Sequence, residues 1–151
     1  MADLVTHYLT ARIPTSRLER PIQAAWIMGV LLPDVVCKLY DVLLGSPGRF
    51  EVPSHMVVGS ALYAYLASFA FEERIRGRAW LALWGGGLLH ILVDLFKDTM
   101  GAAASAWCLH PFASRPVEFA VYDPLDWAWT IPVAALVLLA WEWRRARDVR
   151  T

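Results

Sequence analysis

The sequence has little charge and almost no cysteine. Lys and Arg together number 14, Asp and Glu also number 14, and the formal net charge at pH 7 is zero. A chain without a basic excess has no overall field that attracts nucleic acid, so we expect no nucleic-acid partner. The two cysteines, Cys37 and Cys108, are too few for a disulfide framework, and we treat both as thiols.

Several common catalytic motifs are also missing. The sequence holds no Gly-rich phosphate loop, no nucleophile elbow and no paired CxxC motif. Residues 1–20 lack a basic region followed by an apolar one, so we expect no cleavable signal peptide. What remains to carry chemistry is a small set of His and Asp residues in or near apolar segments.

Hydrophobic residues, by contrast, are abundant. They make up 58% of the chain, charged residues make up only 19%, and the mean hydropathy is +0.43, which together favour residence in a membrane. Apolar runs of helical length predict four spanning helices. These runs cover residues 24–32, with a break or kink at Pro33, and then His55–Phe71, Ala79–Phe96 and Trp127–Trp143.

We therefore predict an all-α fold, a multi-pass membrane helical bundle that forms one domain over residues 1–151. About four helices span the membrane, and a short N-terminal helix covers Asp3–Ala11. Lys and Arg residues gather in the segments that this topology places on one face, so the positive-inside rule puts both termini in the cytoplasm. Membrane lipids are the partners that such a fold implies.

The prediction of function starts from the run Gly85–Phe96. It places His90 and Asp94 four residues apart on one face of a helix, close enough for both side chains to reach one ion. An ionised Asp in an apolar membrane helix is costly, on the order of 2.5–3.5 kcal/mol, so we expect Asp94 to have a partner. The glycine triplet 85–87 lets a neighbouring helix approach closely.

Three His and two Asp residues form a candidate metal site: His7, Asp34, His55, His90 and Asp94. Imidazoles and carboxylates suit zinc or a similar divalent ion, and one such ion neutralises two aspartates. Structural roles stay open for several of them. Asp34 can pair with Lys38 one turn on, His55 can cap a helix, and His7 can be structural. We regard His110, in a loop, as structural or accessory.

The order of these motifs resembles that of a known family. The motifs are Thr6-His7, Leu32-Pro33-Asp34, Ser54-His55, His90-x-x-x-Asp94 and Pro111-Phe112. They are similar to those of the membrane-bound metal-dependent hydrolases of bacterial inner membranes, the group that includes the LexA-binding membrane protein. The resemblance runs from His7 to Phe112 and implies a multi-pass protein of the bacterial inner (cell) membrane. It also implies that the five His and Asp residues named above are metal ligands.

A second resemblance bears on the substrate. The order Asp, His and His-x-x-x-Asp is similar to part of the zinc-dependent phospholipase C pattern, which implies a phosphoester or lipid-like substrate. We therefore expect a membrane-bound metal-dependent hydrolase that acts on a small-molecule or lipid substrate through a metal-activated water. Zinc is the expected cofactor. A non-ligating mode of Asp34 is the nearest candidate for a catalytic general base.

Two functions from other classes stay open. In one, the buried Asp and His residues form a metal-free relay in a proton- or ion-handling membrane protein. In the other, the chain is a non-enzymatic membrane adaptor that binds a partner through the loop Lys97–Asp126, and the same residues are structural.

Overall fold

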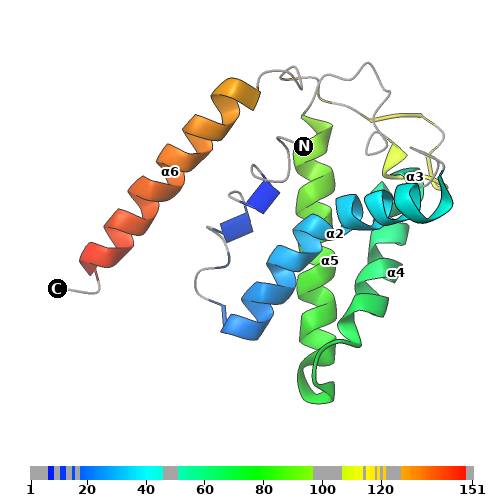
Figure 1. The fold of residues 1–151 in the computed structure, drawn as a ribbon, viewed down its shortest axis with the longest axis horizontal. Coiled ribbons are helices and arrows are strands. Elements are labelled where there is room, and N and C mark those ends of the chain that lie inside the picture. The colour runs from blue at the N-terminus through cyan, green and yellow to red at the C-terminus, as the bar shows by residue number, and fades with distance from the viewer. Residues whose placement is uncertain are drawn as a thin grey trace.

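All regular secondary structure in the described part of the chain is helical. The computed structural model describes residues 7–8, 11–12, 15, 18–45, 51–96, 107–113, 115–117, 119, 121 and 127–148. Its main elements are α2 (Arg20–Leu44), α3 (Glu51–His55), α4 (Val57–Ser68), α5 (Glu73–Leu95) and α6 (Trp127–Asp148) (Figure 1). The all-α prediction is confirmed. The predicted helix over Asp3–Ala11 is helical at its described residues 7, 8 and 11, and its other residues lie outside the described ones.

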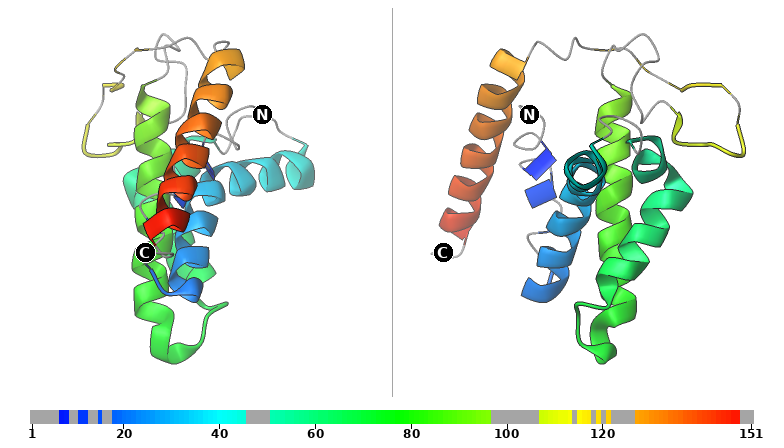
Figure 2. Two further views of the ribbon diagram at one scale, coloured as in Figure 1. Left: turned by 90° about the vertical axis from the view of Figure 1, so that its left-hand side faces the viewer. Right: turned by 45° about the vertical axis from the view of Figure 1, so that its right-hand side comes forward.

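Helix α2 begins and ends as its sequence predicts. Pro21 lies in the first turn, where its missing N–H costs nothing. Gly45 follows the last turn with φ of 58°, a left-handed conformation that favours glycine, and its N–H donates to the Asp41 carbonyl at 3.1 Å. The helix continues through Pro33 and bends along its length (Figure 2), so Pro33 produces a kink and not a break.

Helix α5 lies between α2 and α4 and packs against both (Figure 1). The contact with α2 is close because glycines face the other helix's backbone. A Cβ added at Gly86 would collide with the Trp26 carbonyl and lie 2.8 Å from the Val30 nitrogen, and one added at Gly29 would collide with the Leu83 backbone. The glycine triplet thus permits the close approach that the sequence predicted. The core beside it consists mostly of small residues: Ala25, Ala64, Ala79, Ala82 and Leu83.

The prediction of a multi-pass membrane bundle is wrong. The predicted inner-membrane localisation and the predicted orientation of the termini both require spanning helices, so they are wrong as well. None of the helices in the described residues has a stretch both long and apolar enough to cross a bilayer. A spanning helix needs about 20 mostly apolar residues. Helix α4 has only 12, and α5 begins with the charged segment Glu73–Arg78 and carries Asp94 near its end. The predicted runs are helices, but they are too short or too often interrupted by polar residues.

Two predicted boundaries are also wrong. The run from His55 to Phe71 is not one helix, because α3 ends at His55 and α4 begins at Val57. Residues 51–55 form the short helix α3. The run predicted from Ala79 starts too late, because the charged residues 73–78 form the first turns of α5. These changes bring His55 to a helix end that points it toward α2 and α5.

Candidate metal centre

Four parts of the chain bring the five predicted site residues together. Asp34 follows the kink residue Pro33 in α2, and His55 is the last residue of α3. His90 and Asp94 lie one turn apart on α5, and His7 comes from the short helical segment before α2. His7 and His90 are 0% exposed, His55 is 6% exposed and Asp94 is 8% exposed. Residues separated by most of the chain therefore meet in one buried cluster.

Ligand atoms of Asp34, His55 and His90 lie within 4.8 Å of one another, and an oxygen of Asp94 lies close to both of these imidazoles. His55 Nε2 and His90 Nε2 are 3.2 Å apart, and His90 Nε2 lies 3.3 Å from Asp94 Oδ2. Asp34 Oδ1 lies 3.8 Å from His55 Nε2 and 3.9 Å from His90 Nε2. His55 Nε2 and Asp94 Oδ2 are separated by 3.8 Å. Asp34 and Asp94 thus each direct one oxygen toward both imidazoles.

These separations are short enough for a shared metal ion. Zinc, for example, binds nitrogen and carboxylate oxygen at about 2.0–2.1 Å, which places the ligand atoms of a tetrahedron about 3.3 Å apart. The separations that involve an imidazole nitrogen are 3.2–3.9 Å and match this spacing or exceed it by a few tenths of an ångström. The donor set of two imidazoles and two carboxylates is one that zinc accepts.

Hydrogen bonds orient the two imidazoles within the cluster. His90 Nδ1 lies 2.8 Å from the Val30 carbonyl oxygen, which can only accept, so Nδ1 carries the proton and donates it. In the neutral ring this leaves the lone pair on Nε2, the atom that faces the cluster. His55 Nδ1 lies 3.0 Å from Ser54 Oγ. Such partners on the far nitrogen are typical of metal-binding His residues.

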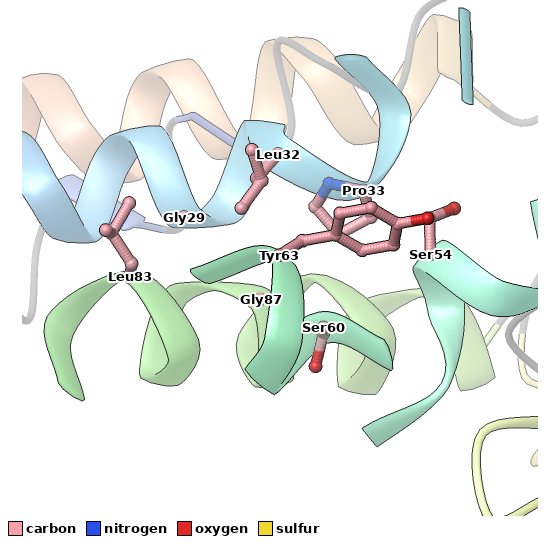
Figure 3. A pocket seen from close by; sticks show the side chains of 8 residues that line it. All are labelled: Gly29, Leu32, Pro33, Ser54, Ser60, Tyr63, Leu83 and Gly87. Carbon is pink, nitrogen blue, oxygen red and sulfur yellow. The ribbon is translucent and has the colours of Figure 1, made fainter. Parts of the chain in front are cut away.

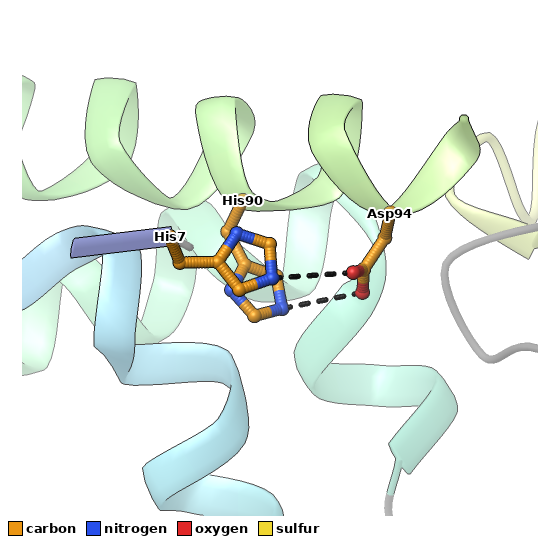
Figure 4. Close-up of side chains that lie close together, drawn as sticks. All are labelled: His7, His90 and Asp94. Carbon is orange, nitrogen blue, oxygen red and sulfur yellow. Dashed lines mark ion pairs between the residues drawn. The ribbon is translucent and has the colours of Figure 1, made fainter. Parts of the chain in front are cut away.

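His7 contacts the cluster by packing its ring against that of His90. The two imidazole rings stack with centroids 4.0 Å apart and planes inclined by 22°. His7 Nε2 lies 3.3 Å from Asp94 Oδ1, the carboxylate oxygen that does not face His90 (Figure 4). His7, His90 and Asp94 therefore form a second group of ligand atoms, all within 4.8 Å of one another.

The structural explanation for Asp34 does not hold. Lys38 Nζ lies 3.7 Å from Asp41 Oδ2, one turn further along α2, while the Asp34 carboxylate faces His55 and His90. His55 is likewise not a helix cap, since α4 begins after Met56 and has no side-chain cap. Both residues instead direct a possible ligand atom toward His90 Nε2, in a group that could hold a metal ion.

Water can approach the cluster from the side of Asp34. The Asp34 side chain is 29% exposed, whereas that of Asp94 is 9% exposed and those of His55 and His90 are more buried still. On the other side, Tyr63, Ser54 and Pro33 lie together along a narrow crevice between α2, α4 and α5 that has no room for a water molecule (Figure 3). Burial raises the pKa of Tyr63, and its hydrogen bond with Tyr40 adds to the effect.

Sequence reasoning missed the backbone part of the centre. Val30 contributes only its carbonyl oxygen, and no side-chain pattern marks a residue for that role. Gly29, which meets α5 near Leu83, is a further sequence signal for the close approach, beside the glycine triplet 85–87. His110, predicted to be structural or accessory, is exposed in the turn 107–113.

The fold and the cluster define a helical protein with a buried His/Asp group able to hold a metal ion. Comparison with protein families, curated proteins and solved structures gives no match for this chain. The resemblance to metal-dependent hydrolases therefore stays a prediction, and the function is argued from the geometry of the cluster.

Proposed function

We propose that the protein is a metal-dependent hydrolase of phosphoester substrates. The proposal is carried by the two imidazole nitrogens, His55 Nε2 and His90 Nε2, which lie 3.2 Å apart and are each 3.3–3.9 Å from an oxygen of Asp34 and an oxygen of Asp94. Two carboxylates and two imidazoles with held orientations suit one divalent ion, zinc by preference. The motif order supports the choice of phosphoesters, since it is similar to part of the zinc-dependent phospholipase C pattern.

The residues of the cluster have different roles in the proposed hydrolysis. A divalent ion held by these residues would lower the pKa of a bound water and so supply a nucleophile near neutral pH. Asp34 is the most exposed of the four ligand residues, and if its Oδ1 held the ion, its Oδ2 would be left to accept a proton from the attacking water. As the water oxygen bonds to phosphorus, the phosphorus–ester oxygen bond breaks. The proton held by Asp34 passes to the departing alcohol, which balances the reaction.

The test measures metal content and phosphodiester hydrolysis on the same samples. The purified chain is stripped with a chelator, reloaded with Zn²⁺ and assayed on bis(p-nitrophenyl) phosphate. We expect hydrolysis to disappear on stripping and to return on reloading. His90→Ala and Asp94→Ala should each lower both metal content and hydrolysis at least tenfold.

Matched variants control for loss of folding. His110→Ala removes an exposed imidazole outside the cluster, and Asp41→Asn removes a carboxylate that pairs with Lys38 on the same helix as Asp34. Both should keep metal and hydrolysis, whereas Asp34→Asn should lose hydrolysis. Equal, near-zero metal in the wild type and in a His90→Ala/Asp94→Ala variant would remove the proposal. Bound metal with no phosphodiester hydrolysis would contradict the reaction but leave the metal centre.

A further inference from the structure

The two oxygens of the Asp94 carboxylate face different imidazoles. Oδ2 lies 3.3 Å from His90 Nε2 and Oδ1 lies 3.3 Å from His7 Nε2 (Figure 4). A carboxylate that serves one ion with one oxygen has its second oxygen available to serve another. Asp94 is thus placed as a bridge between two groups of ligand atoms.

The stacking of the two rings argues against a single shared ion. An imidazole lone pair lies in the ring plane, and the planes of His7 and His90 are only 22° from parallel, at a centroid distance of 4.0 Å. Both Nε2 atoms face the same carboxylate, so their lone pairs run side by side. An ion midway between the rings would lie about 2 Å out of each plane, roughly half the stacking distance, where neither ring has a lone pair.

Two ions, each in the plane of its own ring, fit the same geometry. Their separation would be close to the ring spacing of 4.0 Å. Hydrolytic enzymes with two ions hold them about 3.5–4 Å apart. The stack of His7 on His90, with one oxygen of Asp94 facing each ring, therefore matches the spacing of a carboxylate-bridged pair.

We propose that Asp94 bridges two divalent ions and that His7 is the ligand of the second. The first ion takes His55, His90, Asp34 and Asp94 Oδ2, and the second takes His7 and Asp94 Oδ1. This inference rests on the proposed metal centre and extends it. The second ion has fewer protein ligands among the described residues, so it binds more weakly. Two oxygens of one phosphoester can contact both ions, which favours substrates with an unesterified oxygen pair.

Metal stoichiometry tests the inference without relying on activity. The stripped full-length chain is titrated with Zn²⁺, followed by calorimetry and by metal analysis after gel filtration. We expect two equivalents in the wild type, bound in a tight and a weaker step. His7→Gln should bind one, because a glutamine amide can still donate to Asp94 Oδ1 but its nitrogen has no lone pair for a metal. His110→Gln, the matched control, should bind two.

Loading with Mn²⁺ supplies a second readout. Two Mn²⁺ ions joined by a carboxylate give an exchange-coupled paramagnetic resonance spectrum, and His7→Gln should give the spectrum of an isolated ion. The glutamine variant also covers the case in which His7→Ala fails to fold, and circular dichroism checks both.

Each remaining outcome is decisive. One equivalent in both the wild type and His7→Gln, or two in both, overturns the bridging role and leaves the hydrolase proposal standing. No bound metal in any variant overturns both.

Discussion

His90 Nδ1 lies 2.8 Å from the carbonyl oxygen of Val30, a residue sixty positions earlier in the chain. This bond joins the last third of α5 to the turn of α2 that precedes Pro33, the kink residue. Pro33 has no N–H to donate to Gly29, so the backbone ladder of α2 is interrupted beside the Val30 carbonyl. The direction of His90 Nε2 therefore depends on how closely α2 and α5 approach.

That dependence gives the first prediction, for Gly86→Ala. The new Cβ collides with the Trp26 carbonyl and approaches the Val30 nitrogen, so the two helices must move apart. We expect the free energy of unfolding to fall by about 1–3 kcal/mol, the usual cost of overpacking. Zinc affinity should fall with it, because Val30 and His90 lose their spacing. Urea denaturation and zinc titration measure the two effects.

Gly77→Ala is the matched control on the same helix. A Cβ at Gly77 meets nothing within 4 Å. Replacing a helical glycine in open space should raise stability by about 0.5–1 kcal/mol and leave zinc affinity unchanged. If Gly86→Ala proved as stable as Gly77→Ala, the close approach of α2 and α5 would be refuted.

The second prediction concerns Ser54, whose hydroxyl lies 3.0 Å from His55 Nδ1. Without this partner His55 rotates more freely and its Nε2 is a poorer ligand, so Ser54→Ala should weaken zinc binding by about 10–100-fold. Ser68→Ala removes a buried hydroxyl that donates to the Tyr65 carbonyl at 2.6 Å, away from the cluster. Zinc affinity should be unchanged in that variant. Equal affinities in the two variants would show that Ser54 does not orient His55.

Much of the candidate site could be predicted because its side chains are unusual for their positions. Helical periodicity alone places His90 and Asp94 on one face, and the structure has them one turn apart on α5. Asp34 and His55 stood out as polar residues beside apolar runs, and they lie in the same cluster. What could not be predicted is which oxygen of Asp94 faces which imidazole, since that depends on how separate helices pack.

The membrane prediction failed for a different reason. The run Ala79–Phe96 includes Trp80, Trp84 and the glycine triplet 85–87, which do not interrupt the helix but contribute little hydropathy. The Trp80 and Trp84 rings stack 6.1 Å apart, and each indole N–H donates to a backbone carbonyl of the helical region 57–61. The charged residues before Ala79 belong to the same helix, α5. Over its whole length, α5 therefore has no stretch both long and apolar enough to cross a bilayer.

The last prediction uses the crevice beside the candidate metal centre, where Tyr63 lies. Burial, and then the hydrogen bond with Tyr40, raises the pKa of the Tyr63 hydroxyl above its usual value of 10.0. Above that value an unfolded chain loses the proton while the folded chain retains it. The folded state then binds more protons than the unfolded one. The contribution of Tyr63 to the free energy of unfolding is therefore complete below pH 10.0 and is lost as the pH rises through the raised pKa.

Tyr63→Phe has no proton to lose at this position and should remove this contribution. We expect its free energy of unfolding to fall less steeply than that of the wild type between about pH 9 and 11. Urea denaturation at a series of pH values measures the slopes, and phenolate absorbance follows the ionisation directly. Tyr65→Phe, on the same helix and outside the crevice, is the matched control. Parallel slopes for the wild type and Tyr63→Phe would mean that the hydroxyl of Tyr63 ionises as readily in the folded chain as in the unfolded one.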